Sequence, residues 1–280
     1  MNQLALHPVT KSKIDTFARH PAHAVLLIGP KGSGKYSIAR YIAEIILPTK
    51  TIETYPYIHH IEPTKNTIPI DAIREIDAFV SLKVPGSHPI KRVVIIESAD
   101  SMGTEAQNAL LKNLEEPPLD TIFILTATKA KNMLPTILSR VQTIVVGQPS
   151  KDALKNEFPA VDSNQFSRAY LMSGGNSGTL TALLDTADHI LVTAADYARK
   201  ILSTSTYERL AMIDEIVKIA DMPSLLTEML GQMAHVSLLQ SNGTAYTKWL
   251  HILEESYTAH IALQENAHAK LVLTNLMLQL

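Results

Sequence analysis

The chain of 280 residues contains no cysteine. Disulfide bonds, thiol catalysis, and zinc or iron–sulfur sites with cysteine ligands are therefore excluded. The eleven histidines show no His-Glu-x-x-His pattern, which is the spacing that would place two of them on one metal. We expect the histidines to be structural or to face solvent, and we predict no metal site and no zinc.

Excess charge and long apolar runs are also missing. The 25 Lys and Arg residues nearly balance the 27 Asp and Glu residues, which excludes a strongly basic chain that holds nucleic acid by bulk electrostatics. Contact with DNA would have to be local or shared with partners. No apolar run reaches the length of about eighteen residues that spans a membrane, and residues 1–8 lack the features of a signal peptide. We expect a cytoplasmic protein with no membrane contact.

What is present is a globular composition, with 46% hydrophobic and 19% charged residues. Up to about residue 148, short β-branched apolar runs alternate with helical patterns. This alternation predicts an α/β fold with a parallel sheet that is covered by helices on both faces. The runs are residues 24–28, 93–96, 122–125 and 143–146, with a weaker candidate at 57–61.

Helical patterns alone continue after about residue 149. The segment 174–178 reads Gly-Gly-Asn-Ser-Gly and predicts a turn between helices, and residues 222–224 and 241–243 predict further breaks. We therefore predict three domains. They are an α/β domain at residues 1–148, a small helical domain at 149–198 and an all-helical domain at 199–280.

A glycine-rich loop follows the first predicted strand and precedes an amphipathic helix. Its residues are Gly29, Pro30, Lys31, Gly32, Ser33, Gly34, Lys35 and Tyr36. They match Gly-x-x-x-x-Gly-Lys, the P-loop pattern in which backbone N–H groups and a helix N-terminus surround phosphate oxygens. We predict that these eight residues form a nucleotide-phosphate site, with Lys35 directed at the outer phosphates.

Two departures argue against hydrolysis at this loop. The residue after the loop lysine is ordinarily Ser or Thr, whose hydroxyl coordinates Mg²⁺, and here it is Tyr36. The strand at 93–96 continues with Glu97 and Ser98, where an active site has Asp and then Glu. Glu97 is a candidate to reach a metal, but Ser98 cannot act as a base. Two alternatives stay open: ATP or ADP is bound without turnover, or the loop keeps its fold without nucleotide.

Two longer segments resemble a known family. Residues 105–118 read Glu-Ala-Gln-Asn-Ala-Leu-Leu-Lys-Asn-Leu-Glu-Glu-Pro-Pro, and residues 134–140 read Leu-Pro-Thr-Ile-Leu-Ser-Arg. Both are similar to the AAA+ clamp-loader subunits of bacterial DNA polymerase III, as are segments 61–76 and 264–271. The resemblance implies that the three predicted domains are a P-loop AAA+ domain, a helical lid and an oligomerising collar.

Within that family the chain looks most like the delta-prime type. The gamma/tau motor subunits keep Thr at the position of Tyr36 and Asp-Glu at the positions of Glu97 and Ser98, whereas delta-prime subunits often carry degraded versions. The resemblance therefore implies a stator without ATPase activity of its own. Its implied partners are the delta and gamma/tau subunits, the sliding clamp and, through the assembled complex, primed DNA.

The resemblance also implies roles for single residues. Thr128 falls at the sensor-1 position, near the γ-phosphate. Arg140 falls on the arginine finger of a Ser-Arg-Cys motif, which acts in trans on the ATP site of a neighbouring subunit. Thr179 replaces the sensor-2 arginine, so that contact is lost. Without the resemblance, Arg140 would be interpreted as a surface arginine that caps the last strand.

Other residues receive structural interpretations. The leucines of the 105–118 segment predict a buried helix face, and three polar residues are predicted on or near its exposed side, facing DNA, a neighbouring subunit or solvent: Gln107, Asn108 and Lys112. A basic cluster is too sparse to predict a DNA site: Lys83, His88, Lys91 and Arg92.

Two rival functions remain. The first is a catalytically active, gamma/tau-like motor subunit with an unusual Mg²⁺ site, supported by Lys35 and Glu97; magnesium-dependent ATP binding would favour it. The second is a phosphotransferase of small substrates. It is disfavoured because the sequence offers no acceptor-site base and devotes residues 199–280 to a helical bundle.

Overall fold

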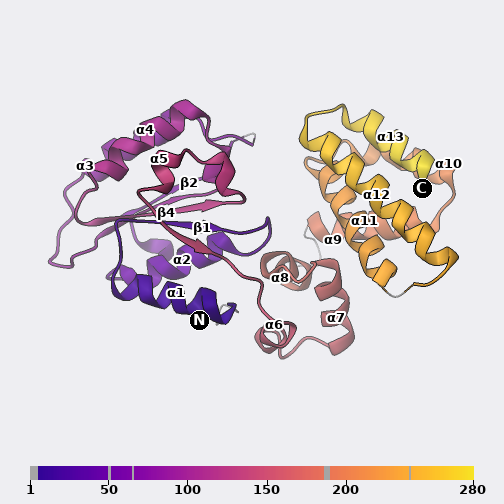
Figure 1. Ribbon diagram of the computed structural model, residues 1–280, viewed down its shortest axis with the longest axis horizontal. Helices are drawn as coiled ribbons and strands as arrows, with labels where there is room; N and C mark the ends of the chain where they lie inside the picture. Colours follow the sequence, from indigo (N-terminus) through magenta and orange to yellow (C-terminus); the bar gives the residue numbers. More distant parts are fainter. Residues whose placement is uncertain (1–5, 50–51, 65, 186–189, 240) are drawn as a thin grey trace. The chain divides into compact units, whose positions relative to one another are not determined.

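The computed structural model describes residues 6–49, 52–64, 66–185, 190–239 and 241–280. They form two compact units that divide between residues 157 and 158 (Figure 1). The first unit contains the sheet and the second is helical. The finer division into three domains stays a prediction.

The first unit is built on five parallel strands in the order β2-β3-β4-β1-β5. This confirms the predicted α/β class and all five candidate runs, the weak one at 57–61 included. The strands are β1 (Ala24–Ile28), β2 (Ile58–Ile61), β3 (Arg92–Ile96), β4 (Thr121–Ala127) and β5 (Gln142–Val145).

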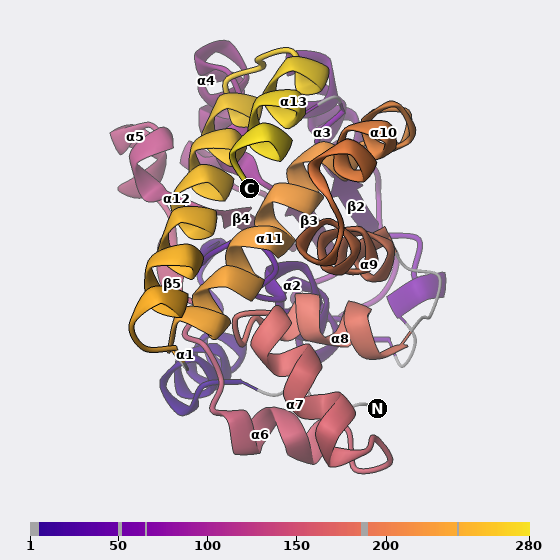
Figure 2. The ribbon, with the colours of Figure 1, turned by 90° about the vertical axis from the view of Figure 1, so that its right-hand side faces the viewer.

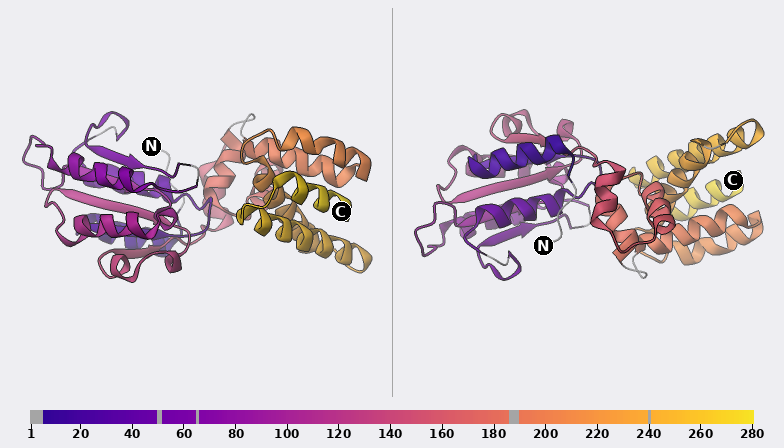
Figure 3. Two further views of the ribbon diagram at one scale, coloured as in Figure 1. Left: turned by 90° about the horizontal axis from the view of Figure 1, so that it is seen from above. Right: turned by 90° about the horizontal axis from the view of Figure 1, so that it is seen from below.

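Each face of the sheet has its own core, because successive side chains of a strand point to opposite faces. Val25 packs with α1 (Pro8–Arg19) and α2 (Lys35–Ile46) on one face. Its neighbour Leu26 packs on the other face with three helices: α3 (Ile70–Ser81), α4 (Thr104–Glu115) and α5 (Pro135–Leu138). Figure 3 shows the helices on both sides of the strands. The described residues of this unit also form three short 3₁₀ helices and one further helix: η1 (Ile52–Thr54), η2 (Ala99–Ser101), η3 (Ala130–Asn132) and α6 (Lys151–Glu157).

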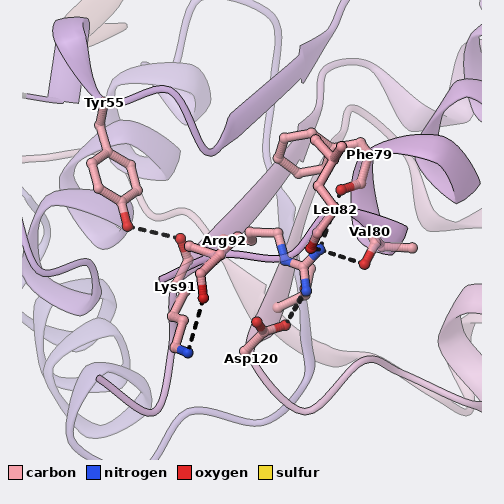
Figure 4. Close-up of polar contacts among 9 residues, drawn as sticks. Tyr55, Phe79, Val80, Leu82, Lys91, Arg92 and Asp120 are labelled. Carbon is pink, nitrogen blue, oxygen red and sulfur yellow. Dashed lines mark hydrogen bonds and ion pairs between the residues drawn. The ribbon is translucent and has the colours of Figure 1, made fainter. Parts of the chain in front are cut away.

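Arg92, the first residue of β3, is buried and closes the C-terminal end of α3 (Figure 4). Its Nη1 donates to the carbonyls of Phe79 at 3.2 Å and Leu82 at 3.0 Å and also to that of Val80, and its Nη2 donates to Oδ1 of Asp120 at 2.6 Å. The last carbonyls of a helix have no intrahelical partner, so the guanidinium supplies the missing donors. Arg92 is thus a structural residue and not a surface cation for DNA.

Regular elements of the second unit are all helical among the residues described there. They are α7 (Ser163–Met172), α8 (Ser177–Asp185), α9 (Ile190–Ser203), α10 (Thr206–Ile216), α11 (Met222–Leu239), α12 (Thr244–Gln264) and α13 (Ala269–Gln279). The two longest, α11 and α12, pack side by side (Figure 2). In the parts of the chain that the structure describes, no helix has both the length and the apolarity to cross a membrane.

The predicted breaks lie at helix ends. Gly174 and Gly175 have φ values of 58° and 76° and link α7 to α8, a left-handed turn that favours glycine. Pro223 lies in the first turn of α11, where its missing N–H removes no helical hydrogen bond. Residues 222–224 therefore open a helix, and residues 241–243 precede α12.

Candidate functional site

The glycine-rich loop lies between the end of β1 and the start of α2, as predicted. Gly32 and Gly34 have φ values of 78° and 76°, a conformation that glycine adopts without strain. At Gly29 an added Cβ would lie 2.9 Å from Oγ of Ser33 and 3.2 Å from Cβ of Val146. The loop therefore needs glycine at Gly32 and Gly34 for its turn, and at Gly29 for close packing against the residue after β5.

Lys35 lies over this loop. Its Nζ donates to the carbonyls of Gly29 and Pro30, both at 2.8 Å. Burial lowers the pKa of the Lys35 ammonium, while the negative charges of Asp100 and Glu97 oppose that shift. An ammonium has three donors, so two hold it to the loop and the third is available to a phosphate oxygen.

Tyr36, His60 and Glu97 form a cluster beside the loop. The ring of Tyr36 stacks on the imidazole of His60, with 4.7 Å between ring centroids and 22° between planes. Nε2 of His60 lies 2.9 Å from Oε1 of Glu97. Because β2 and β3 are parallel neighbours, the residues at their carboxyl ends meet at one edge of the sheet. His60 was expected to be structural or solvent-facing, and its contact with Glu97 depends on the pairing of β2 with β3, for which the sequence gives no local signal.

The loop fits a nucleotide phosphate better than it fits Mg²⁺. Its glycines have left-handed backbone and Lys35 lies over the loop, and these are features of loops that bind anions through backbone N–H groups and a lysine. Glu97, the predicted candidate for a metal, already accepts a hydrogen bond from His60, and the Tyr36 ring is stacked in the same cluster. Among the described residues, no group of three or more acidic or histidine side chains has an arrangement that could hold a metal ion.

Asp100 and Thr128 meet where β3 and β4 end. Oδ2 of Asp100 accepts hydrogen bonds from the backbone N–H groups of Thr128 at 2.9 Å and Lys129 at 3.1 Å. The side chain of Thr128 is exposed, and Asp100 lies near enough to Lys35 to influence its pKa. The structure thus brings Thr128 to the same edge of the sheet as the loop residues. Asp100 was not predicted as a site residue, although its place in the sequence, three residues after Glu97, puts it close to the end of the same strand.

The prediction that Gln107 lies on the exposed side of its helix is wrong. Gln107 is only 4% exposed. Its Oε1 accepts from the N–H of Leu134 at 2.8 Å, and its Nε2 donates to the carbonyls of Met102 and Asn132, both at 3.0 Å. The physical reason is that the first turn of α4 faces the segment 130–134, whose backbone polar groups need partners. Asn108 and Lys112 are exposed, as predicted.

Arg140 lies between α5 and β5, outside the cluster around the loop. Its Nη1 donates to the carbonyl of Thr136 at 2.9 Å and to Oγ of Ser139 at 3.2 Å. Its Nη2 lies 2.9 Å from Oε1 of Glu115, the last residue of α4. These contacts are with α4, α5 and the bend after α5, and none is with the phosphate loop. The structure therefore separates Arg140 from the other predicted site residues.

A family model and several curated relatives match this chain. A family model described as "DNA polymerase III, delta subunit" matches residues 11–150, half of the chain. The DNA polymerase III subunit delta' of Pseudomonas aeruginosa is 31% identical in an alignment of length 196 that covers 61% of this chain and 58% of that protein. The Bacillus subtilis subunit delta' is 34% identical in an alignment of length 138 that covers 44% of this chain and 41% of that protein.

The chain spans about half the length of the curated relatives it matches. Among solved structures, a DNA polymerase III gamma subunit-related protein from Thermotoga maritima aligns with a TM-score of 0.62 and 18% identity. That alignment covers 96% of this chain and 97% of the other. At this level of identity the likeness shows a common fold.

Proposed function

Because the chain belongs to the DNA polymerase III delta-prime subunit family, we propose that it is a delta-prime-like subunit of a clamp loader. In this role it joins delta and gamma/tau subunits in a ring that loads the sliding clamp on primed DNA during replication. The chain acts as a stator, and Arg140 completes the ATP site of the adjacent subunit. The observation that carries the proposal is the placement of Arg140, whose side chain is 35% exposed and makes its contacts away from this chain's own loop.

The guanidinium of Arg140 does not use all of its hydrogen-bond donors in contacts with the described residues. Three of its five N–H groups make the contacts to Thr136, Ser139 and Glu115. Its Nε–H and the second hydrogen of Nη2 have no partner among the described residues. A planar guanidinium is well matched to phosphate oxygens, and a trans arginine contributes about 10³–10⁵-fold to turnover in related phosphoryl-transfer sites.

This chain's own loop is proposed to bind ATP or ADP without turning it over. Lys35 and the loop backbone supply the phosphate contacts, but Ser98 cannot act as a base and Glu97 is engaged by His60. ATP turnover by the purified chain that is abolished in Lys35→Ala would overturn the stator role and favour the motor subunit.

Assembly is proposed to use the helices at the end of the chain. On α12 and α13, the apolar side chains of Tyr257, Leu271 and Leu278 are exposed. A cavity of about 280 Å³ lies between the same two helices, and Leu271 and Leu276 are among its lining residues. Exposed apolar surface of this kind is typical of a surface that packs against another subunit.

The test is the DNA-stimulated ATPase of the reconstituted clamp loader with wild-type chain, Arg140→Ala or Arg74→Ala. Arg74 is a matched control, since it is an exposed arginine in an ion pair with Asp71. Light scattering on the same samples checks that the ring assembles. We expect a steep fall in turnover with Arg140→Ala only. Unchanged turnover with Arg140→Ala in an assembled ring would overturn the trans role of Arg140. Failure of the wild-type chain to assemble would overturn the proposed function as a clamp-loader subunit.

A further inference from the structure

We propose that Glu115 is a positioning residue for Arg140. Its carboxylate holds the guanidinium against this chain, and the phosphates of a neighbouring ATP site compete for it. This inference rests on the proposed trans role of Arg140 and assigns to Glu115 the control of how readily that arginine is released to a neighbour.

The backbone before Arg140 is fixed, so the position of its side chain depends on local partners. Gln107 holds the N–H of Leu134 at 2.8 Å, and the N–H of Arg140 donates to the carbonyl of Ile137 at 2.9 Å. From this anchored bend the guanidinium reaches Oε1 of Glu115 at 2.9 Å. The segment that carries the arginine is therefore tied to α4 at the beginning of the helix by Gln107 and at its last residue by Glu115.

The C-terminal end of α4 carries negative charge that attracts a cation. Glu115 and Glu116 are adjacent at the C-terminus of the helix, where the helix dipole already contributes partial negative charge. Lys112 is the basic residue of the last helical turn, but its Nζ is paired with Asp77 at 3.1 Å. Among the described residues, the guanidinium of Arg140 is the cation paired with Glu115, and its departure removes that compensation.

The ion pair between Arg140 and Glu115 is weak enough for a phosphate to replace Glu115. Arg140 and Glu115 side chains are 35% and 51% exposed, and an ion pair with such exposure is screened by solvent and salt. A phosphate carries more charge than one carboxylate and accepts several charge-assisted hydrogen bonds from one guanidinium. The Nε–H group and the second Nη2 hydrogen of Arg140 permit a first contact with phosphate before Glu115 is released.

The test compares Glu115→Gln with Glu116→Gln in the reconstituted clamp loader. Both changes remove one negative charge from the same helix end, but only Glu115 contacts Arg140. We expect Glu115→Gln to raise kcat/KM for ATP about two- to fivefold, the range of an exposed ion pair. Glu116→Gln is expected to leave it unchanged. The gain should shrink at high salt, where the wild-type pair is already screened.

A double-mutant cycle shows whether Glu115 acts through Arg140. If it does, Glu115→Gln combined with Arg140→Ala will match Arg140→Ala alone. In the isolated chain, NMR relaxation of the Arg140 Nε–H group should report greater mobility in Glu115→Gln than in wild type or Glu116→Gln.

The outcomes separate this inference from the function on which it rests. Suppose that Arg140→Ala lowers turnover but kcat/KM for ATP in Glu115→Gln equals that of wild type or is lower. The proposal that Glu115 competes with phosphate for Arg140 is then wrong, and the trans role of Arg140 stands. If Arg140→Ala leaves turnover unchanged in an assembled ring, both are wrong. An unchanged Arg140 Nε–H signal in Glu115→Gln also overturns the positioning role.

Discussion

The ring of Tyr36 is stacked on the imidazole of His60 at a centroid separation of 4.7 Å. Through His60 this contact extends to Glu97, whose Oε1 lies 2.9 Å from the imidazole Nε2. The two departures from an active P-loop site, at Tyr36 and at Glu97, are therefore parts of one cluster. The side chains at the metal-binding positions contact one another through His60.

This cluster predicts that magnesium does not raise the nucleotide affinity of the isolated chain. Isothermal titration calorimetry with ADP should give the same affinity in Mg²⁺ and in EDTA, because Glu97 is engaged and Tyr36 offers no nearby hydroxyl ligand. Tyr36→Thr combined with His60→Asn restores a hydroxyl and frees the carboxylate, so its affinity should become magnesium-dependent. Lys35→Ala serves as the control that weakens phosphate binding in either buffer. A wild-type affinity that rises with Mg²⁺ would instead support the motor subunit.

Arg92→Met is predicted to destabilise the first unit strongly. The variant removes the guanidinium donors to the carbonyls of Phe79, Val80 and Leu82 and leaves the carboxylate of Asp120 without its ion-pair partner. Removal of one partner from a buried ion pair costs about 3–5 kcal/mol. Urea denaturation followed by circular dichroism measures the loss. Lys83→Met, at an exposed neighbouring position, should change the free energy of unfolding by less than about 0.5 kcal/mol, and an equal loss in both variants would contradict the role of Arg92.

The sheet could be predicted from the sequence because its strands carry the signal locally. A strand that is buried on both faces reads as a short continuous apolar run, and residues 24–28 and 93–96 do so. The phosphate loop is local in the same way, since its glycines, Lys35 and the helix that follows are consecutive in the chain. Contacts within eight residues need no knowledge of the strand order.

The residues that sequence reasoning missed depend on contacts between distant segments. His60 meets Glu97 only because β2 pairs with β3, and the ion pair of Arg140 with Glu115 joins residues 25 positions apart. Gln107 was placed on or near the exposed side because the leucines of its segment were taken as the buried helix face. Its spacing of three and seven residues from Leu110 and Leu114 already places it on their buried face, whereas its three backbone partners in the segment 102–134 become visible only in the folded chain.

Gln107→Ala is predicted to cost about 3 kcal/mol or more of stability. The change leaves the N–H of Leu134 and the carbonyls of Met102 and Asn132 buried or partly buried without their side-chain partner, and each such group contributes about 1–3 kcal/mol. Thermal and urea unfolding of the purified chain measure the effect. Asn108→Ala, at the exposed next position of the helix, is the matched control and should be nearly neutral. Equal stability of the two variants would show that water replaces the three hydrogen bonds of Gln107.

His59 predicts a loss of stability on mild acidification. Its ring stacks on Phe79 with 5.1 Å between centroids, and its buried Nε2 has no hydrogen-bond partner in the described part of the chain. Burial lowers the pKa of His59; the nearby charge of His60 adds to that shift and Glu75 opposes it. Because the folded pKa lies below the unfolded value of about 6.5, the unfolded chain binds more protons between the two values. Stability is therefore complete above about pH 6.5 and falls as the pH drops toward the folded pKa.

The measurement is the urea-unfolding free energy of wild type, His59→Phe and His20→Gln between about pH 7 and pH 5. His59→Phe keeps an aromatic ring on Phe79 and removes the titrating group, so its stability should depend less steeply on pH than that of wild type. His20 is exposed, and its side chain has no hydrogen bond or ion pair among the described residues. His20→Gln should therefore retain the wild-type slope. Identical slopes for wild type and His59→Phe would assign the acid sensitivity to other groups, because the buried imidazole would then carry the same charge in the folded and unfolded chain.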